Sequence, residues 1–359
     1  MLAKPPVLKY TGHRFFDIRI CTAVLARRPI VIDRIRDDDE APGLTDGEVL
    51  LLRLIERLTN NTTVRINITG TRVFVKPGII IGGSFTFDTS AHRSMGYYIP
   101  SILLLSAFSK QPTEVVLSGI TDGLDDDPSV EYFVQSIVPL VQQFGLDFAR
   151  IQVKSRGFPP LGGGEVIVSG RPVRELTPIS YLKRGEIKQV RGTVTACRIS
   201  PAVPSRLILT AREQLSQKFS DVYISTNHVK GAEAGRSPGA SICLTAESKK
   251  GSLLSVWASL GPGQAPEELS ELAGKKLRHL VKQGGVIDSH AQPWTLLLML
   301  FCKTSRSTVK LSHVSRRGLE VISLAQSTFG INFEIKEESD HVLVSVLGLG
   351  LPNYARVSC

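Results

Sequence analysis

The chain has 359 residues, of which 42% are apolar and 21% charged, values typical of a globular protein with room for two domains. A net charge of +10 favours a polyanionic partner, although charge alone defines no chemistry. The aromatic content of 6% argues against a stacking platform for single-stranded nucleic acid as the main binding device. Apolar runs are short and Lys4 with two prolines interrupts the N-terminal one, so we expect neither a membrane-spanning helix nor a signal peptide.

The five cysteines are scattered and none forms a CxxC pair. An odd number of cysteines without metal-ligand spacing predicts reduced, mostly buried thiols in an intracellular protein. We therefore expect no bound metal.

The first part of the chain alternates helix and strand patterns. Thr45 is followed three residues later by Glu48, the spacing of a capping box, and apolar residues then recur at helical intervals. The expected elements are a helix at 15–26, a strand at 28–36, a helix from 45 to about 58, and strands at 63–68 and 72–76.

A similar order recurs twice. The second copy is expected as a helix at 96–108, a strand at 114–119, a helix at 129–144, and strands at 150–154 and 165–169. The third is expected as a helix at 294–301, a strand at 308–312, a helix at 318–329, and strands at 332–336 and 341–346. Such a repeat implies three α/β units packed around one axis.

Residues 185–285 break this pattern between the second and third copies. Their order is strand, helix, three strands and a helix, which suggests an inserted small α/β domain. The prediction is an α+β fold: a large domain of three repeated units (residues 1–184 and 286–359) and the inserted domain (185–285).

Residues 157–164 (GFPPLGGG) contain three consecutive glycines after two prolines. Such a run indicates positive φ angles or a close approach of the backbone to another group. One interpretation is an anion-binding nest of free N–H groups. The favoured one is a tight connection between two strands, packed against a neighbouring element, because no Walker lysine or GxGxxG pattern is present.

Several motifs occur in the order and spacing of the RNA 3′-terminal phosphate cyclases, and the resemblance extends from about Tyr10 to Val346. They are Pro42-Gly43-Leu44, Lys76-Pro77-Gly78 with Gly82-Gly83, residues 118–123 (SGITDG), residues 157–164, and Val190-Arg191-Gly192. The resemblance implies the large domain of three repeats and the inserted domain. Within that family it is most similar to the eukaryotic cyclase-like branch, on residues 36–39 (RDDD), 96–98 (GYY), 221–224 (DVYI), 230–231 (KG) and 286–289 (VIDS).

The resemblance also implies that the cyclase active site is degenerate. The cyclases attach AMP to a histidine at the start of the helix in the third repeat, where this chain has Arg317. A guanidinium stays protonated and cannot be the nucleophile, and His313 would need a different loop path to replace it. The positions of the former site are Arg14, Asp17, Arg93, Gln292 and Arg317, of which Arg14 and Arg93 fall where the cyclases have a glutamine and a glycine. The acidic residues 37–40 replace a basic loop. We expect no cofactor.

The branch implies a nucleolar, non-enzymatic assembly factor of the small ribosomal subunit. It would act in early pre-rRNA processing within the small nucleolar ribonucleoprotein processome, as a monomer in a large complex, and bind a large nucleolar GTPase. The alternative is an RNA-processing enzyme, either a residual cyclase or a pre-rRNA endonuclease. A metal-dependent nuclease would need clustered carboxylates, for which 37–40 and 125–127 are candidates, although solvated turn residues explain both.

Cationic residues supply the candidates for binding. Those for an anion or RNA are Arg14, Arg93, Arg306, Lys310, Arg316 and Arg317, and those for the partner protein are Lys230, Arg236, Lys249 and Lys250. Solvated surface charge remains an equal explanation for the cations near Arg317.

Overall fold

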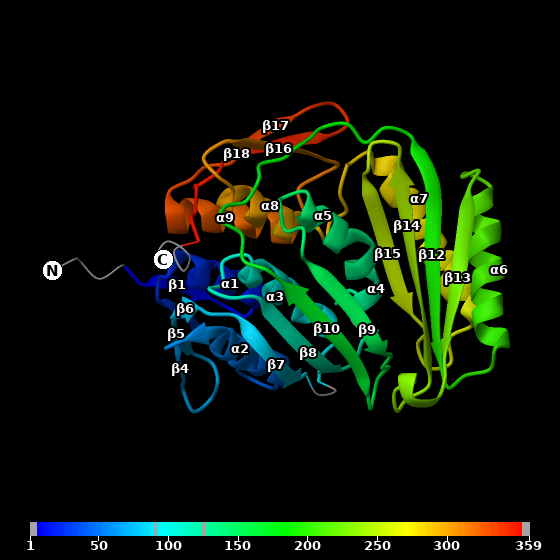
Figure 1. Ribbon diagram of the computed structural model, residues 1–359, viewed down its shortest axis with the longest axis horizontal. Coiled ribbons are helices and arrows are strands. Elements are labelled where there is room, and N and C mark those ends of the chain that lie inside the picture. Colours follow the sequence, from blue (N-terminus) through cyan, green and yellow to red (C-terminus); the bar gives the residue numbers. More distant parts are fainter. Residues whose placement is uncertain (1–5, 90–91, 124–126, 354–359) are drawn as a thin grey trace.

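A computed structural model describes residues 6–89, 92–123 and 127–353 (Figure 1). They form an α+β fold with four four-stranded sheets. Three of the sheets have the same order, in which the first strand is parallel to the second, the second antiparallel to the fourth, and the fourth antiparallel to the third. The three predicted repeats are therefore confirmed.

The first unit contains β1 (Leu8–Thr11), α1 (Phe16–Ala26), β2 (Ile30–Asp33), α2 (Asp46–Leu58), β4 (Thr63–Ile66) and β5 (Val73–Lys76), with the small sheet of β3 (Thr59–Asn60) and β6 (Ile79–Ile80) beside it. The predicted capping box at the start of α2 is present. Thr45 Oγ1 accepts the N–H of Glu48 at 3.3 Å, and a Glu48 carboxylate oxygen accepts the N–H of Thr45 at 2.9 Å.

The second unit contains β7 (Gly83–Asp88), the 3₁₀ turn η1 (Met95–Tyr97), α3 (Ile99–Ser106), β8 (Thr113–Gly119), α4 (Val130–Tyr132), the π-helical η2 (Phe133–Ile137), α5 (Val138–Gln142), β9 (Arg150–Ser155) and β10 (Gly164–Gly170). The helix predicted at 129–144 begins as expected, with Ser129 as its cap. Its π-helical turn was not predicted. Pro139 has no N–H to continue the α pattern, and Val138 instead donates to the carbonyl of Phe133.

The third unit contains β11 (Ser180–Tyr181), α8 (Gln292–Phe301), β16 (Arg306–Leu311), α9 (Arg316–Phe329), β17 (Glu334–Glu337) and β18 (Val342–Leu347). β11 pairs in parallel with β16, although more than a hundred residues separate them in the chain. The inserted segment therefore interrupts the third unit after its first strand. Placing it between the second and third units was wrong, because a two-residue strand has no alternation by which sequence could reveal it.

The inserted segment contains β12 (Ile187–Cys197), α6 (Ala202–Ser216), β13 (Val222–Val229), the short turn η3 (Gly231–Glu233), β14 (Gly239–Ser248), β15 (Leu253–Ser259) and α7 (Pro266–Gln283). This is the predicted order of elements. The sheet, ordered β13-β12-β14-β15, stands beside the other three (Figure 1), and α6 and α7 pack against it around a hydrophobic core of their own. The exact domain boundaries stay a prediction.

The three repeated units share one core built on α1, α3 and α8. Every residue of α3 and α8 is buried, so both helices are mostly apolar on all sides and show no amphipathic stripe. The described cysteines, Cys21, Cys197, Cys243 and Cys302, are buried and unpaired, as predicted. Cys359 lies outside the described residues.

The glycine-rich loop at 157–164 joins β9 to β10 and packs against the inserted segment. The N–H of Arg236 donates to the carbonyl of Gly162 at 2.9 Å, and the N–H of Leu161 donates to Ser237 Oγ at 3.0 Å. A Cβ on Gly157 would lie 2.3 Å from the backbone nitrogen of Gly164 and 2.4 Å from the carbonyl oxygen of Gly119. The loop is therefore the tight strand connection against a neighbouring element, and the glycines permit its close backbone contacts.

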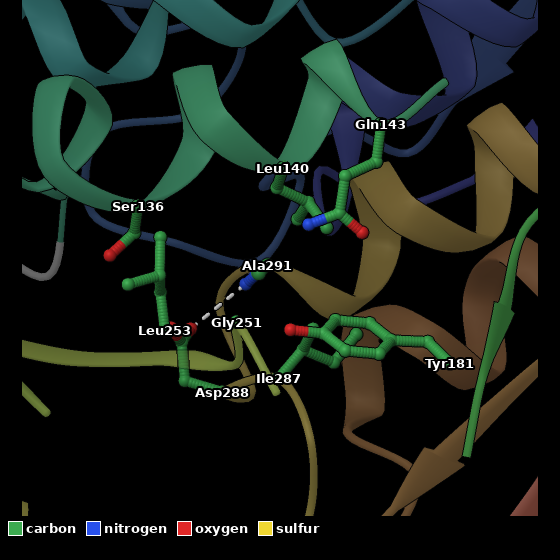
Figure 2. A pocket seen from close by; sticks show the side chains of 9 residues that line it. All are labelled: Ser136, Leu140, Gln143, Tyr181, Gly251, Leu253, Ile287, Asp288 and Ala291. Carbon is green, nitrogen blue, oxygen red and sulfur yellow. Dashed lines mark hydrogen bonds between the residues drawn. The ribbon is translucent and has the colours of Figure 1, made fainter. Parts of the chain in front are cut away.

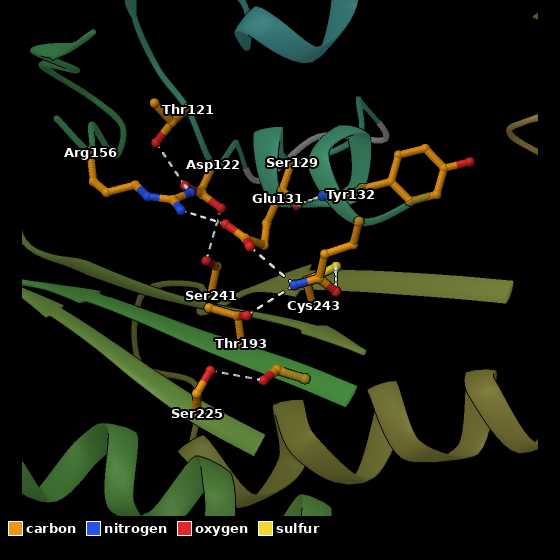
Figure 3. A network of polar contacts seen from close by, with 12 residues as sticks. Thr121, Asp122, Ser129, Glu131, Tyr132, Arg156, Thr193, Ser225, Ser241 and Cys243 are labelled. Atoms are coloured by element: carbon orange, nitrogen blue, oxygen red, sulfur yellow. Dashed lines mark hydrogen bonds and ion pairs between the residues drawn. The ribbon is translucent and has the colours of Figure 1, made fainter. Parts of the chain in front are cut away.

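A buried polar network lies beside this loop and joins the second unit to the fourth sheet (Figure 3). At its centre is Arg156, whose side chain is 5% exposed and ion-pairs with Glu131, with Nη1 3.7 Å from Asp122 Oδ2. Asp122 also accepts a hydrogen bond from Ser241 Oγ on β14 at 2.9 Å. Gln135 extends the network through hydrogen bonds to hydroxyls of β12 and β14. These contacts fix the fourth sheet against the second unit.

Candidate functional site

Two of the residues that the resemblance assigns to the cyclase site, Asp17 and Arg317, meet where α1 and α9 begin. Arg317 lies in the first turn of α9, which Ser315 caps by accepting the N–H of Gly318 at 3.1 Å. Its guanidinium ion-pairs with Asp17 in the first turn of α1, whose side chain is only 4% exposed. A guanidinium held by a buried carboxylate can compensate charge, but it offers no nucleophilic lone pair.

A second ion pair joins the same two helices. Arg19 Nε on α1 lies 2.7 Å from Glu320 Oε1 on α9, and both side chains are largely buried. Arg19 also donates to the carbonyl oxygens of Thr11 and Gly12, which fixes the chain just before α1. These two pairs set the relative position of the first and third units at the site.

Arg93 is held by a bidentate ion pair. Its Nε and Nη2 lie 2.5 and 2.9 Å from the two carboxylate oxygens of Asp127, and its guanidinium stacks over the Tyr97 ring at 3.4 Å. Burial alone would lower the pKa of Arg93, but the hydrogen bonds and charge of Asp127 outweigh it and raise that pKa. Gly47 allows this packing, because a Cβ there would lie 3.0 Å from Arg93 Cδ. Arg93 is therefore held between Asp127 and the Tyr97 ring.

Arg36 forms a second bidentate pair, with contacts of 2.7 and 3.0 Å to the carboxylate of Glu48. Glu48 thus both caps α2 and neutralises a neighbouring cation. The spacing of Thr45 and Glu48 in the sequence predicted only the capping role of Glu48. Nearby, Arg34 pairs with Asp37 and Asp38 of the acidic segment.

Gln292 is fully buried and holds the loop before α9. Its Nε2 donates to the carbonyl of His313 at 2.9 Å, and its Oε1 accepts the N–H of Ser315 at 2.7 Å. The backbone is thus fixed on both sides of Val314, on the approach to α9. His313 is itself exposed, and this hydrogen bonding opposes the different loop path that it would need to take the place of Arg317.

The remaining candidate cations near α9 differ in their availability. Arg14 and Arg316 are exposed, form no ion pair with any residue that the structure describes, and flank the Asp17–Arg317 pair along their own segments. Lys310 is partly exposed near the end of β16. Arg306 begins that strand and pairs with Glu334, so it lies away from the loop that leads to α9.

The four candidate cations of the inserted segment fall into two pairs. Lys230 and Arg236 flank the turn between β13 and β14, whereas Lys249 and Lys250 form the turn after β14. β14 has ten residues, a length of about 34 Å, so the two pairs lie at opposite ends of the sheet. Lys249 is paired with Glu186 at 2.6 Å. One small interface cannot contain all four.

Carboxylate clusters for a nuclease were a further candidate. Within residues 6–89, 92–123 and 127–353, no three His, Cys, Asp or Glu side chains come together as a group that could hold a metal ion. Asp125 and Asp126 lie outside the described residues, and Asp127 is the partner of Arg93. The described part of the chain also has no helix long and apolar enough to cross a membrane.

A groove of about 490 Å³ separates β15 and α7 from the loops at 288–290 and 313. Trp257 and His290 form an edge-to-face pair in it, with ring centroids 4.4 Å apart. Asp288 lines the groove and also a small cavity on its other side, where Figure 2 shows it hydrogen-bonded to the N–H of Ala291. Sequence reasoning did not identify this groove, because its walls come from segments far apart in the chain, such as those of Gly123 and Trp257.

Asp288 has an unusual environment. One carboxylate oxygen accepts hydrogen bonds from Tyr132 Oη at 2.7 Å and from two backbone N–H groups, whereas the other is buried without a partner among the described residues. Burial raises the pKa of Asp288 above its usual value. The folded protein therefore disfavours the charged form, and the carboxylate costs stability above the unfolded-state pKa of 3.8.

We expect Asp288→Asn to stabilise the protein relative to wild type at pH 8, and this advantage to shrink as the pH falls through the raised pKa of Asp288 towards 4. Each unit of pKa shift corresponds to about 1.4 kcal/mol. Thermal unfolding from pH 4 to 8 measures the difference. Asp37→Asn is the control: Arg34 lowers the pKa of Asp37, so that difference should be small and of opposite sign. If the difference in stability between Asp288→Asn and wild type is the same at every pH, the pKa of Asp288 is not raised in the folded protein.

The fold defines an RNA 3′-terminal phosphate cyclase architecture, in which the charged residues where α1 and α9 meet are paired with one another. The family model described as RNA 3′-terminal phosphate cyclase matches residues 8–335. The chain is 37% identical to the RNA 3′-terminal phosphate cyclase-like protein of Bos taurus, over 99% of both chains, and 37% identical to that of Homo sapiens, over 97% of both. It is 34% identical to the rRNA processing protein rcl1 of Schizosaccharomyces pombe, over 97% of both. The chain belongs to the RNA 3′-terminal phosphate cyclase family.

Proposed function

We propose that this protein is a non-enzymatic nucleolar assembly factor of the small ribosomal subunit. It acts in early pre-rRNA processing within the processome and binds a large nucleolar GTPase. The similarity to proteins named cyclase-like, and to one named as an rRNA processing protein, supports a role in rRNA maturation. The nucleolar location, the processome and the GTPase are parts of the proposal.

The observation that carries the non-enzymatic part is the Asp17–Arg317 ion pair. The resemblance puts Arg317 at the position of the adenylylated histidine, and Asp17 engages its guanidinium from a buried position. A nucleotide phosphate would have to compete with this carboxylate for the guanidinium of Arg317, whose side chain is 37% exposed. Arg93 and Arg36 are likewise engaged by Asp127 and Glu48. These three ion pairs support the proposal that the residues at this position stabilise the structure and do not catalyse a reaction.

Binding is assigned to the cations that remain unpaired. Arg14 and Arg316, with Lys310 nearby, are proposed to contact phosphates of pre-rRNA, since exposed guanidinium groups bind phosphate well. The GTPase is proposed to contact one of the two cation pairs of the inserted segment. Lys230 with Arg236 is the stronger choice, because Lys249 is already paired with Glu186.

Depletion of the protein from its own cells tests the proposal. We expect uncleaved small-subunit rRNA precursors to accumulate while mature large-subunit rRNA is maintained, as measured by hybridisation to each precursor. Affinity purification of the tagged protein should recover pre-rRNA and a large GTPase. Normal small-subunit rRNA after complete depletion would contradict the proposed function.

A further inference from the structure

A second groove, of about 300 Å³, lies at the end of the second unit's sheet that is remote from the inserted segment. β8 and β9 begin there and β10 ends there. Its walls include Phe148, Arg150, Glu114 and Arg171. β10 has seven residues, about 23 Å, and its other end joins the glycine-rich loop. The groove therefore lies away from the glycine-rich loop, and none of its lining residues belongs to the Asp17–Arg317 or Arg19–Glu320 ion pairs of α1 and α9.

Phe148 is the unusual member of this groove. Its side chain is 49% exposed, and no other phenylalanine among the described residues is among the exposed large apolar side chains. The Arg171 guanidinium lies over its ring, 4.2 Å from the centroid. Leaving half of a phenylalanine in water forgoes part of the free energy that its full burial would provide. An exposed ring already stacked on a guanidinium is a ready surface for another flat group.

The charges around the ring favour an anion. Arg150 and Arg171 are exposed and form no ion pair within the part of the chain that the structure describes. Glu114 is the one acidic wall residue. Ser169 on β10 lies opposite both Glu114 on β8 and Arg150 on β9. Two strand spacings, about 10 Å, therefore separate the backbone of Glu114 from that of Arg150. Both arginines thus remain available on the Phe148 side of the groove.

We propose that this groove binds a nucleotide of single-stranded RNA. The base stacks on Phe148, and Arg150 and Arg171 contact the flanking phosphates. Stacking on an aromatic ring together with cations along the backbone is how proteins hold single strands without reading their sequence. The size of the groove suits one nucleotide, and the net charge of +10 favours approach of a polyanion. The inference rests on the proposed role in pre-rRNA processing and adds a second RNA contact to it.

Fluorescence anisotropy of the full chain with a labelled single-stranded RNA of about 12 nucleotides tests the groove. Loss of one stacked base costs about 1–3 kcal/mol, so Phe148→Ala should weaken binding roughly tenfold, while Phe148→Trp should retain it. The control is Tyr223→Ala, which removes another exposed aromatic, 64% exposed, from β13 in the fourth sheet and should leave affinity unchanged. Ultraviolet cross-linking to RNA that contains 4-thiouridine should label a peptide with Phe148.

Equal affinity of wild type and Phe148→Ala for RNA would overturn the proposal, as would binding of an acidic peptide, but not of RNA, at this groove. These results are distinct from failure of the proposed function. Normal rRNA after depletion would refute the assembly role even if Phe148 cross-links to RNA. A protein without RNA affinity would refute the groove even if depletion blocks small-subunit maturation.

Discussion

Replacing Arg156 by alanine is expected to lower the free energy of unfolding by about 3–5 kcal/mol, the usual cost of removing one partner from a buried ion pair. Arg156 is 4% exposed and is the cation of the network that includes Asp122 and Glu131. Without it two carboxylates remain at the junction with the fourth sheet, and burial makes uncompensated charge expensive. The fourth sheet should separate from the second unit early in denaturation.

Urea denaturation followed by tryptophan fluorescence measures this loss, since Trp257 lies on β15 against Tyr132, with ring centroids 4.7 Å apart. The matched control is Arg191→Ala. Arg191 also pairs with an aspartate, Asp221, but at the surface, where both side chains are more than a third exposed, so its loss should cost less than about 1 kcal/mol. Equal effects of the two substitutions would show that burial of the Arg156 network contributes nothing.

Gly157→Ala is expected to cost about 3 kcal/mol, the upper part of the range for overpacking. The added Cβ would meet backbone atoms of Gly164 and Gly119 at 2.3 and 2.4 Å, and backbone cannot move aside as a side chain can. The glycine-rich loop would lose its contacts with the segment around Arg236. Both the contact with the inserted segment and the β9–β10 hairpin should therefore become less stable.

Gly263→Ala is the control for Gly157→Ala. Gly263 has a φ of +73° and an added Cβ there meets nothing within 4 Å, so only backbone strain of about 1 kcal/mol is expected. Thermal unfolding of both variants compares the two costs. If Gly157→Ala is no more destabilising than Gly263→Ala, the close packing of the loop is not what requires glycine.

Local patterns in the sequence were sufficient for most elements of the fold. The Thr45–Glu48 spacing located the start of α2, because capping depends on residues three apart. The first strand of each unit, β1, β7 or β11, was missed. β11 is only two residues long and its partner β16 follows the inserted segment. The π-helical turn before Pro139 was missed because helical spacing does not distinguish an α turn from a π turn.

The site was less predictable, because its properties depend on which charges meet. The resemblance supplied Arg317 and Asp17 as positions, yet no local pattern indicated that they form an ion pair across 300 residues. Arg306 and Arg316 are ten residues apart in sequence. Arg306, at the start of β16, pairs with Glu334, whereas Arg316 lies beyond the end of that strand and is exposed. Charge counts along a chain do not show such pairings.

The central claim is that the fold of a cyclase is retained here without its chemistry. The most direct test is incubation of the purified protein with α-labelled ATP, magnesium and an RNA with a 3′-phosphate, beside an active RNA 3′-terminal phosphate cyclase. We expect no label on the protein and no cyclic phosphate on the RNA, because Arg317 is a protonated guanidinium paired with Asp17. A covalent adenylate or a cyclic phosphate end would contradict the account.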